Sequence, residues 1–312
     1  MNTNRECGCK SFRTCVVCET AFGLKPWDWG NQLREEKRTF YELDVLTGKC
    51  FGSNNREETL GEFPGIEIIP DFISESEETQ LVKDLDLLPW DSSQSGRRKQ
   101  NFGPRANFKK RKVKIGTFRG FPECSRFVQD RFSSCPLLRG FCAVEQCSIE
   151  YRPETGASIE PHIDDCWVWG ERIVQLNLLS DTALTCVPFP GQVVEGQKYN
   201  LADVRSYPRL VEPSSQSLVV SDPLTEKLVG PSYQFRRQFA QENCAVKIPL
   251  PARSLLIMWG PARYEWEHGI LREDIRQRRL VIAYRELSPP YLLGGEHQEL
   301  GEQIRSQAKL SC

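Results

Sequence analysis

The chain has 312 residues, of which 39% are hydrophobic and 27% charged, and its formal net charge is -1. This composition is typical of a globular protein of one large or two modest domains, and a near-zero charge argues against nucleic-acid binding through overall charge. No apolar run approaches the roughly 20 residues that a membrane span needs, so we expect no membrane partner.

A cysteine-rich segment within residues 1–20 is the first predicted element. Its start lacks the apolar stretch of a signal peptide, and 13 cysteines without such a signal indicate a reducing compartment, here the cytoplasm or nucleus. A Cys-x-Cys and a Cys-x-x-Cys pair predict a tetrahedral Zn(II) site formed by Cys7, Cys9, Cys15 and Cys18. The alternatives are a reduced thiol-rich tail and a redox-active pair.

Residues 21–62 predict a connector whose scattered aromatic side chains indicate partial packing on the main domain. We expect that domain over residues 63–292. Near its start, Ser74 and Glu77 form a capping box, which predicts a helix. An apolar stripe of that helix, typical of core packing, consists of Leu81, Val82, Leu85 and Leu88.

Residues 97–114 form a basic segment, with nine cations in eighteen residues, no acid, and Phe102 and Phe108 between the charges. Such a segment is suited to phosphates, with ring stacking available for bases. It is equally suited to an acidic protein surface, and Lys109–Lys112 resembles a nuclear import signal. A solvated loop without a partner is the alternative.

A second helix is predicted over residues 122–132, and after Gly140 short strands separated by turns predict a β sandwich or barrel. A stretch rich in Pro, Ser, Gln and Gly over residues 188–243 predicts a surface insertion. The end of the chain, residues 293–312, predicts a polar tail with a short helix. The expected strands are 142–151, 159–164, 172–179, 244–248, 254–259 and 279–285.

His162 and Asp164 stand two residues apart, so that in an extended strand both side chains point the same way and can bind one ion. A site with two histidines needs a second of the three in the chain, and His268 follows an apolar strand and a turn, whereas His297 lies in the polar tail. Two histidines and one carboxylate leave three positions of an octahedron open, as in non-haem Fe(II) oxygenases. A surface histidine beside a carboxylate is the alternative.

Arg279 and Arg285 are six residues apart in one predicted strand, and therefore project from one face of it. Two guanidinium groups side by side favour an anionic partner, and a carboxylate fits best. The alternative is a pair of rim arginines that bind neighbouring acidic side chains.

Together these residues resemble the AlkB-type Fe(II)- and 2-oxoglutarate-dependent dioxygenases, most closely the fourth animal AlkB homologue. The resemblance covers about residues 63–290, and an Arg-Glu-Cys-Gly-Cys-Lys string precedes it. It rests on His162-x-Asp164, His268, Arg279-x5-Arg285, Tyr151-Arg-Pro, and two longer strings from Ser93 to Gln100 and from Pro161 to Arg172.

The resemblance implies an α+β protein with a mainly β core, a double-stranded β-helix (jelly roll) of two antiparallel sheets with flanking N-terminal helices. It implies catalytic iron on His162, Asp164 and His268, with Arg279 and Tyr151 on the distal carboxylate of 2-oxoglutarate and Arg285 near its other end. The family's arginine strand often carries Asn and Thr where this chain has Val281 and Ala283, and its Asn two residues before the tyrosine is Ile149 here. A hydrogen bond to the cosubstrate is therefore expected from elsewhere, for instance from Asn177.

The implied reaction uses Fe(II), 2-oxoglutarate and O2 to remove an N-methyl group as formaldehyde. The basic segment falls where the family has its substrate lid, with contacts expected from Arg97, Arg98, Lys99, Phe102 and Phe108. Proteins resembling this one act on monomethyl-lysine in actin, with an effect on actomyosin, or on N6-methyladenine in DNA. We expect the actin activity first, DNA demethylation second, and a non-catalytic adaptor with a zinc knuckle and a basic loop third.

Overall fold

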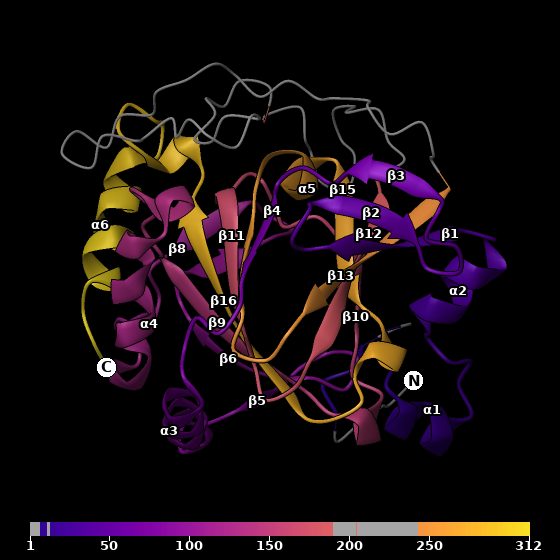
Figure 1. Cartoon of the computed structure of the whole chain (residues 1–312). Helices are drawn as coiled ribbons and strands as arrows, with labels where there is room; N and C mark the ends of the chain where they lie inside the picture. The colour runs from indigo at the N-terminus through magenta and orange to yellow at the C-terminus, as the bar shows by residue number, and fades with distance from the viewer. Residues whose placement is uncertain (1–6, 11–12, 190–203, 205–242) are drawn as a thin grey trace.

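A computed structural model describes residues 7–10, 13–189, 204 and 243–312. Two seven-stranded sheets face each other across an apolar interior, and a separate two-stranded hairpin lies beside them (Figure 1). Residues 190–203 and 205–242, most of the predicted insertion, lie outside the described residues. The strands on either side of it end at Pro188 and begin at Cys244.

The first sheet contains both histidine-bearing strands at one edge. Neighbouring strands within this sheet are antiparallel, except that β1 runs parallel to β13. In spatial order the strands are β10 (Ile159–His162), β15 (Trp266–Ile270), β12 (Thr182–Pro188), β13 (Cys244–Leu250), β1 (Thr39–Asp44), β2 (Lys49–Gly52) and β3 (Thr59–Glu62).

The second sheet is antiparallel throughout and carries the arginine strand at its centre. In spatial order its strands are β4 (Ile66–Ile69), β14 (Leu255–Met258), β11 (Trp169–Leu178), β16 (Arg279–Leu287), β9 (Glu145–Tyr151), β6 (Arg98–Phe102) and β5 (Asp91–Ser92). The hairpin consists of β7 (Arg105–Asn107) and β8 (Lys112–Lys114).

Alternation along the strands produces two apolar layers. One face of each sheet contributes to the interior, for example Val246 of β13 and Val281 of β16. The outer face of the second sheet, with Leu280 and Ile282, packs against helices. This architecture, mainly β with two facing sheets, confirms the predicted fold class.

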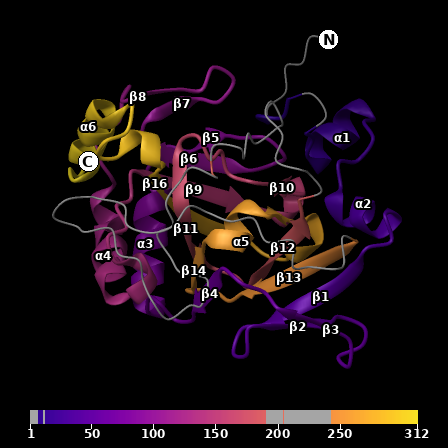
Figure 2. The same ribbon diagram turned by 90° about the horizontal axis from the view of Figure 1, so that it is seen from above.

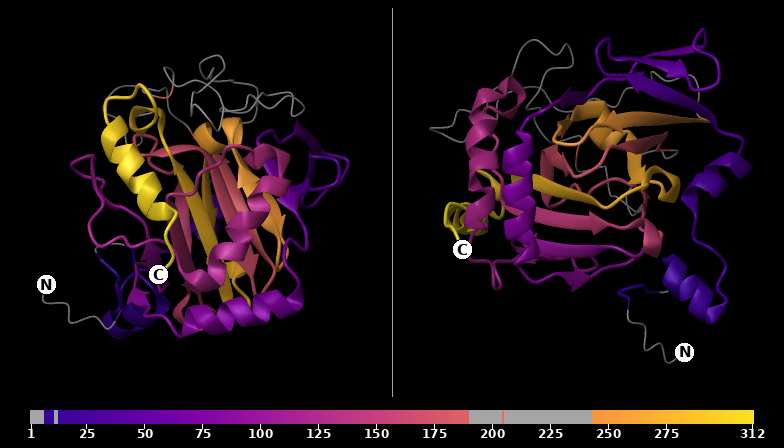
Figure 3. Two further views of the ribbon diagram at one scale, coloured as in Figure 1. Left: turned by 90° about the vertical axis from the view of Figure 1, so that its left-hand side faces the viewer. Right: turned by 60° about the horizontal axis from the view of Figure 1, so that its bottom comes forward.

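Three helices cover the outer face of the second sheet (Figure 3): α3 (Glu75–Asp86), α4 (Arg126–Asp130) and α6 (Gln298–Ala308). The predicted capping box is present at α3, where Ser74 N–H donates to Glu77 over 2.8 Å. The remaining helices are α1 (Val16–Phe22), α2 (Trp29–Glu35) and α5 (Gly260–Tyr264). Within the described residues no helix has the length and apolarity to cross a bilayer.

Several boundaries differ from those expected. The second half of the predicted connector forms β1, β2 and β3 of the first sheet, while β12 and β15 were not predicted as strands. The predicted second helix is one short α-helix between 3-10 turns, and the C-terminal helix is packed rather than free. Gly301 of α6 lies so close to Tyr291 that an added Cβ would be 1.8 Å from its carbonyl oxygen.

The first part of the basic segment is a partly buried strand of the second sheet, next to its edge strand, and not a loop. Strand β6 pairs with β9, and cross-strand neighbours point to the same face. Arg98 is opposite Glu150, whose carboxylate accepts from Arg98 over 2.5 and 2.9 Å, from Arg278 over 2.7 Å and from Arg152 over 3.1 Å. Burial opposes ionisation of Glu150, but the hydrogen bonds from the three arginines lower its pKa to about 2.

We predict that Glu150→Gln destabilises the fold at pH 7 by about 1–3 kcal/mol, because it removes a charge-assisted network. A carboxyl group whose pKa is lowered on folding stabilises the folded state above its ordinary pKa, and this contribution is lost as the pH falls from about 4.5 towards 2. Calorimetric melting of both proteins at pH 7 and pH 3 should show a smaller difference at pH 3. The exposed Glu154→Gln is the control, and a difference independent of pH would contradict the assignment.

Candidate active site

The pairing of β10 with β15 brings the two predicted histidine ligands together. His162 ends β10 and lies directly opposite His268 in the register, with the ring centroids 4.6 Å apart. Asp164 follows two residues after the strand end. One ligand atom from each of the three residues can be chosen so that all lie within 4.8 Å of one another, which is close enough to bind one ion.

The donor atoms of this group fit a divalent metal. The Nδ1 of His162 donates to the Glu160 carbonyl over 2.8 Å, which leaves Nε2 with its lone pair. Asp164 Oδ2 lies 3.8 Å from His268 Nε2 and, among the described residues, is buried without a hydrogen-bond partner. A buried carboxylate oxygen in that state is costly, and a metal ion would remove the cost. Two imidazoles and one carboxylate are the ligand set of Fe(II) oxygenases.

The surroundings keep the three ligands in their metal-binding forms. Burial alone would raise the pKa of Asp164, but the charges of Arg285 and Arg263 lower it below its usual range. Burial and neighbouring His162 lower the pKa of His268 to about 3, and burial also lowers that of His162. The carboxylate is therefore charged and both imidazoles are neutral near pH 7.

Two arginines fix Asp164: Arg285, which the resemblance places near the other end of 2-oxoglutarate, and Arg263, to which the sequence assigned no role. Arg285 donates to Asp164 Oδ1 over 3.0 Å and to the buried Glu145 over 2.6 Å. Arg263 of α5, fully buried, donates to the backbone carbonyl of Asp164 over 2.8 Å. Neither Glu145 nor Arg263 was predicted as a site residue, and no local motif marks either one.

Arg279 forms the second polar centre of the interior. It is opposite Tyr151 in the β9–β16 register, and its guanidinium carbon lies 4.9 Å from the centroid of that ring. Its Nε donates to Asn177 Oδ1 over 2.7 Å, whereas Nη1 and Nη2 are buried without a partner among the described residues. Burial lowers the pKa of this guanidinium. An unpaired buried guanidinium fits a bidentate carboxylate such as the distal one of 2-oxoglutarate.

Asn177 has a different role from the expected direct contact. Its amide nitrogen donates to the carbonyls of Ser180, Leu250 and Pro251 over 2.9 to 3.0 Å, and its oxygen accepts from Arg279. All of its polar atoms are therefore used within the protein. Asn177 orients Arg279, at a place where the family's usual asparagine and threonine are Val281 and Ala283.

The predicted substrate contacts divide between the two faces of β6. Lys99 is opposite Ile149, on the face that lines the interior, and Arg97 lines a cavity beside the metal ligands. Arg98 and Phe102 point to the other face, where Phe102 packs against the helices. Phe108, between β7 and β8, is half exposed and lies 6.3 Å from Trp167. The expectation that Arg98 and Phe102 contact substrate therefore differs from their places in the fold.

A cavity of about 250 Å³ opens next to His162. It carries charges of both signs, with Arg13 and Arg97 on its wall together with Glu160 and Asp165. Ser95, Ile159 and Ile163 complete the lining. We take this cavity, which His162 lines but Asp164 and His268 do not, as the entrance of the site.

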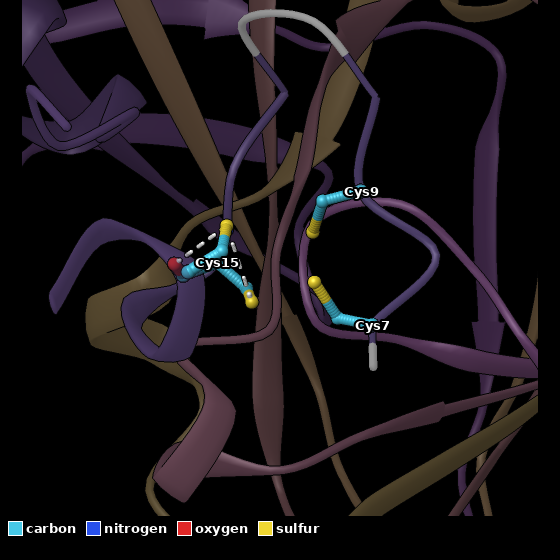
Figure 4. Close-up of side chains that lie close together, drawn as sticks. Cys7, Cys9 and Cys15 are labelled. Atoms are coloured by element: carbon cyan, nitrogen blue, oxygen red, sulfur yellow. Dashed lines mark hydrogen bonds between the residues drawn. The ribbon is translucent and has the colours of Figure 1, made fainter. Parts of the chain in front are cut away.

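The four N-terminal cysteines also converge. One sulfur from each of Cys7, Cys9, Cys15 and Cys18 lies within 4.8 Å of the others, and three of the four residues are buried. Figure 4 shows Cys7 and Cys9 facing Cys15 across a small space. All 13 cysteines of the chain are free thiols in the described structure. Four converging thiols are a donor set that Zn(II) prefers.

Comparisons with known proteins agree with this site. The chain is 41% identical over 303 residues to human alpha-ketoglutarate-dependent dioxygenase alkB homolog 4, covering 96% of this chain and 92% of that protein. The mouse protein of the same name is 39% identical over 98% of this chain and 95% of its own length. A Caenorhabditis elegans protein called DNA N6-methyl adenine demethylase is 28% identical over 96% of this chain and 92% of its length. No protein-family model matches the chain.

We predict that Arg279→Ala raises Kd for 2-oxoglutarate by about 10- to 100-fold, since it removes a charged two-point contact. Iron binding should change little, because the side-chain partner of Arg279 is Asn177 and not a metal ligand. Titration of the Fe(II)-loaded protein with 2-oxoglutarate, followed by absorbance, measures the effect.

Arg279→Lys is the matched variant, and it should recover only part of the affinity because it keeps the charge without the planar fork. Asn177→Ala should weaken 2-oxoglutarate binding less than Arg279→Ala. An unchanged affinity in Arg279→Ala would show that the cosubstrate binds elsewhere.

Proposed function

Because the chain belongs to the alkB homolog 4 family of Fe(II)- and 2-oxoglutarate-dependent dioxygenases, we propose that it removes N-methyl groups from protein, specifically from monomethyl-lysine of actin. The observation that supports demethylation best is the convergence of His162, Asp164 and His268 beside an open cavity, with the unpaired guanidinium of Arg279 in the same interior. An effect on actomyosin would follow from such an activity.

The chain's own residues position the reaction. His162, Asp164 and His268 would hold the iron, Arg279 would bind the distal carboxylate of 2-oxoglutarate, and Arg285 would keep Asp164 oriented. When bound, Fe(II) with 2-oxoglutarate and O2 supplies hydroxylation of an N-methyl group, whose product breaks down to amine and formaldehyde while 2-oxoglutarate becomes succinate and carbon dioxide. Trp169 and Tyr151 are buried in this interior, where their rings would limit the access of water.

The charges around the cavity favour a protein substrate over a nucleic acid. Two carboxylates, Glu160 and Asp165, lie on its wall with Arg13 and Arg97. Because the wall carries both signs, it matches a peptide with a methylated lysine and an acidic side chain better than a continuous polyanion. The free thiols fit a reducing compartment, so we propose the cytoplasm and nucleus as the location.

DNA N6-methyladenine is the second candidate substrate. The nematode relative is named for that activity, and the hairpin around Phe108 carries exposed cations and an aromatic ring suited to a flipped base. A DNA substrate would have to contact the hairpin while avoiding the acidic part of the cavity wall.

We predict that the protein, with Fe(II) and 2-oxoglutarate, releases formaldehyde from monomethyl-lysine actin faster than from N6-methyladenine DNA. Asp164→Ala should abolish release from both, because it removes the carboxylate ligand. The measurement is formaldehyde and succinate formed from the two substrates in parallel.

Other results of this measurement would each favour a different function. Release from DNA alone would replace the proposed substrate by the second candidate. Succinate without formaldehyde would indicate an active dioxygenase with a different substrate. Neither product, together with a partner that binds the Asp164→Ala protein equally well, would favour the adaptor.

We further propose that Cys7, Cys9, Cys15 and Cys18 bind a structural Zn(II). The support is the mutual approach of the four sulfurs and their burial against the dioxygenase core. Tetrahedral tetrathiolate sites are closed, so this metal would stabilise the N-terminal segment and would not react.

We predict about one equivalent of zinc per purified chain, lost in Cys15→Ser because a three-thiol site binds zinc far more weakly. Mass spectrometry of the metals measures it, and Cys312→Ser, which changes an exposed thiol outside the cluster, should keep its zinc. Zinc-free protein with four freely titratable thiols in the cluster would contradict this proposal.

A further inference from the structure

The cysteine cluster lies against the entrance of the active site. Gly8, between Cys7 and Cys9, packs so closely that an added Cβ would be 2.8 Å from the backbone of Ser92 and Ser93. On the other side of the cluster, Glu19 of α1 accepts from Arg272 over 2.6 and 2.8 Å. Figure 2 shows α1 on the same side of the molecule as β10. The N-terminal element is therefore fixed to the core at two points around the entrance.

Arg13 reaches from this element into the entrance. It pairs with Glu160, donates to Gln94 over 3.1 Å, and lines the same cavity as His162. Its side chain remains 40% exposed, while that of Glu160 is 12% exposed. The backbone carbonyl of Glu160 accepts from His162 Nδ1. Arg13 therefore contacts a residue that itself orients the first iron ligand.

The two cysteine pairs flank Arg13 in the chain. It lies between the Cys7–Cys9 pair and the Cys15–Cys18 pair, two residues before Cys15, so the chain on both sides of it is tied to the cluster. Without a metal, the described contacts inside the cluster include only weak thiol bonds, such as 3.7 Å between the sulfurs of Cys15 and Cys18. A bound metal would hold the two pairs together, and with them Arg13, which stands two residues before Cys15.

We propose that Arg13 is a substrate-positioning residue, which binds a carboxylate next to the methylated lysine and which is held in place by the zinc of the cysteine cluster. This rests on the proposed zinc site and on the proposed protein substrate. A guanidinium has five N–H donors, so Arg13 can hold Glu160 and a substrate carboxylate together. Asp165, on the same cavity wall, supplies the opposite charge for the methylated ammonium.

The test uses two monomethyl-lysine peptides that differ by one residue, with either Asp or Asn beside the methyl-lysine. Arg13→Ala should raise KM for the Asp peptide by about tenfold, the loss of one charge-assisted hydrogen bond, and should leave KM for the Asn peptide nearly unchanged. The value of kcat, the affinity for 2-oxoglutarate and the zinc content should stay as in the wild type. Arg119→Ala, which changes an exposed arginine outside the cavity lining, is the control.

Equal effects of Arg13→Ala on both peptides, or none on either, would overturn the role of Arg13. Removal of zinc in Cys15→Ser should reproduce the Arg13→Ala effect on the Asp peptide while 2-oxoglutarate still binds. If zinc loss leaves KM unchanged although Arg13→Ala raises it, the link between metal and arginine is wrong. If the wild type contains no zinc, the zinc proposal fails while the comparison of Arg13→Ala on two peptides still decides the role of Arg13.

Peptide binding to protein loaded with Mn(II) and 2-oxoglutarate, measured by fluorescence anisotropy, needs no turnover. This binding measurement therefore tests the role of Arg13 even if the proposed demethylation is wrong. Tighter binding of the Asp peptide that disappears in Arg13→Ala would support the inference even if formaldehyde is never released from peptides. Identical binding of both peptides to both proteins would reject it.

Discussion

The site depends on the register between β10 and β15, the strands that place His162 and His268 directly opposite each other. In an antiparallel pair a shift of one residue would turn one imidazole to the opposite face of the sheet. The short β10 has few ladder bonds of its own to fix this register, and Arg263 and Arg285 add constraints by holding Asp164 through its backbone and its carboxylate. The metal-binding geometry is therefore maintained by long-range hydrogen bonds as much as by the sheet.

The inner face of β16 carries an arginine near each end, and these two arginines have different roles. At one end Arg285 is neutralised by Glu145 and Asp164, so that it acts as a brace for a ligand. At the other end Arg279 has a neutral partner, Asn177, and keeps its full positive charge for an anion. The intervening Val281 and Ala283 separate the two guanidinium groups by apolar side chains, which limits their repulsion and keeps the two carboxylate sites distinct.

Much of this could be predicted from local sequence, because alternation along a strand fixes which side chains share a face. The placement of Arg279 and Arg285 on one face followed from their even spacing, and the capping box at Ser74 marked α3. The basic segment was misleading since its charges mask the alternation of β6, which separates Arg97 and Lys99 from Arg98 and Phe102. Glu145 and Arg263 could not be found in this way, because their partners lie 140 and 99 residues away in the chain. Strands β12 and β15 mix polar and apolar residues too evenly for a clear periodic signal.

The parallel pairing of β1 with β13 has a consequence for how this protein can be handled. Strand β13 is a central, buried strand only because β1, from the segment before the catalytic core, covers it. A fragment that begins at residue 63 would expose the backbone donors and acceptors of β13 along a flat apolar edge, where a second copy could add its own strand. In the full chain the edge is instead the short β3, which is interrupted by a register shift and a glycine with φ of +92° and is a poor template for such pairing. The segment before the core therefore covers a sheet edge that would otherwise favour edge-to-edge aggregation.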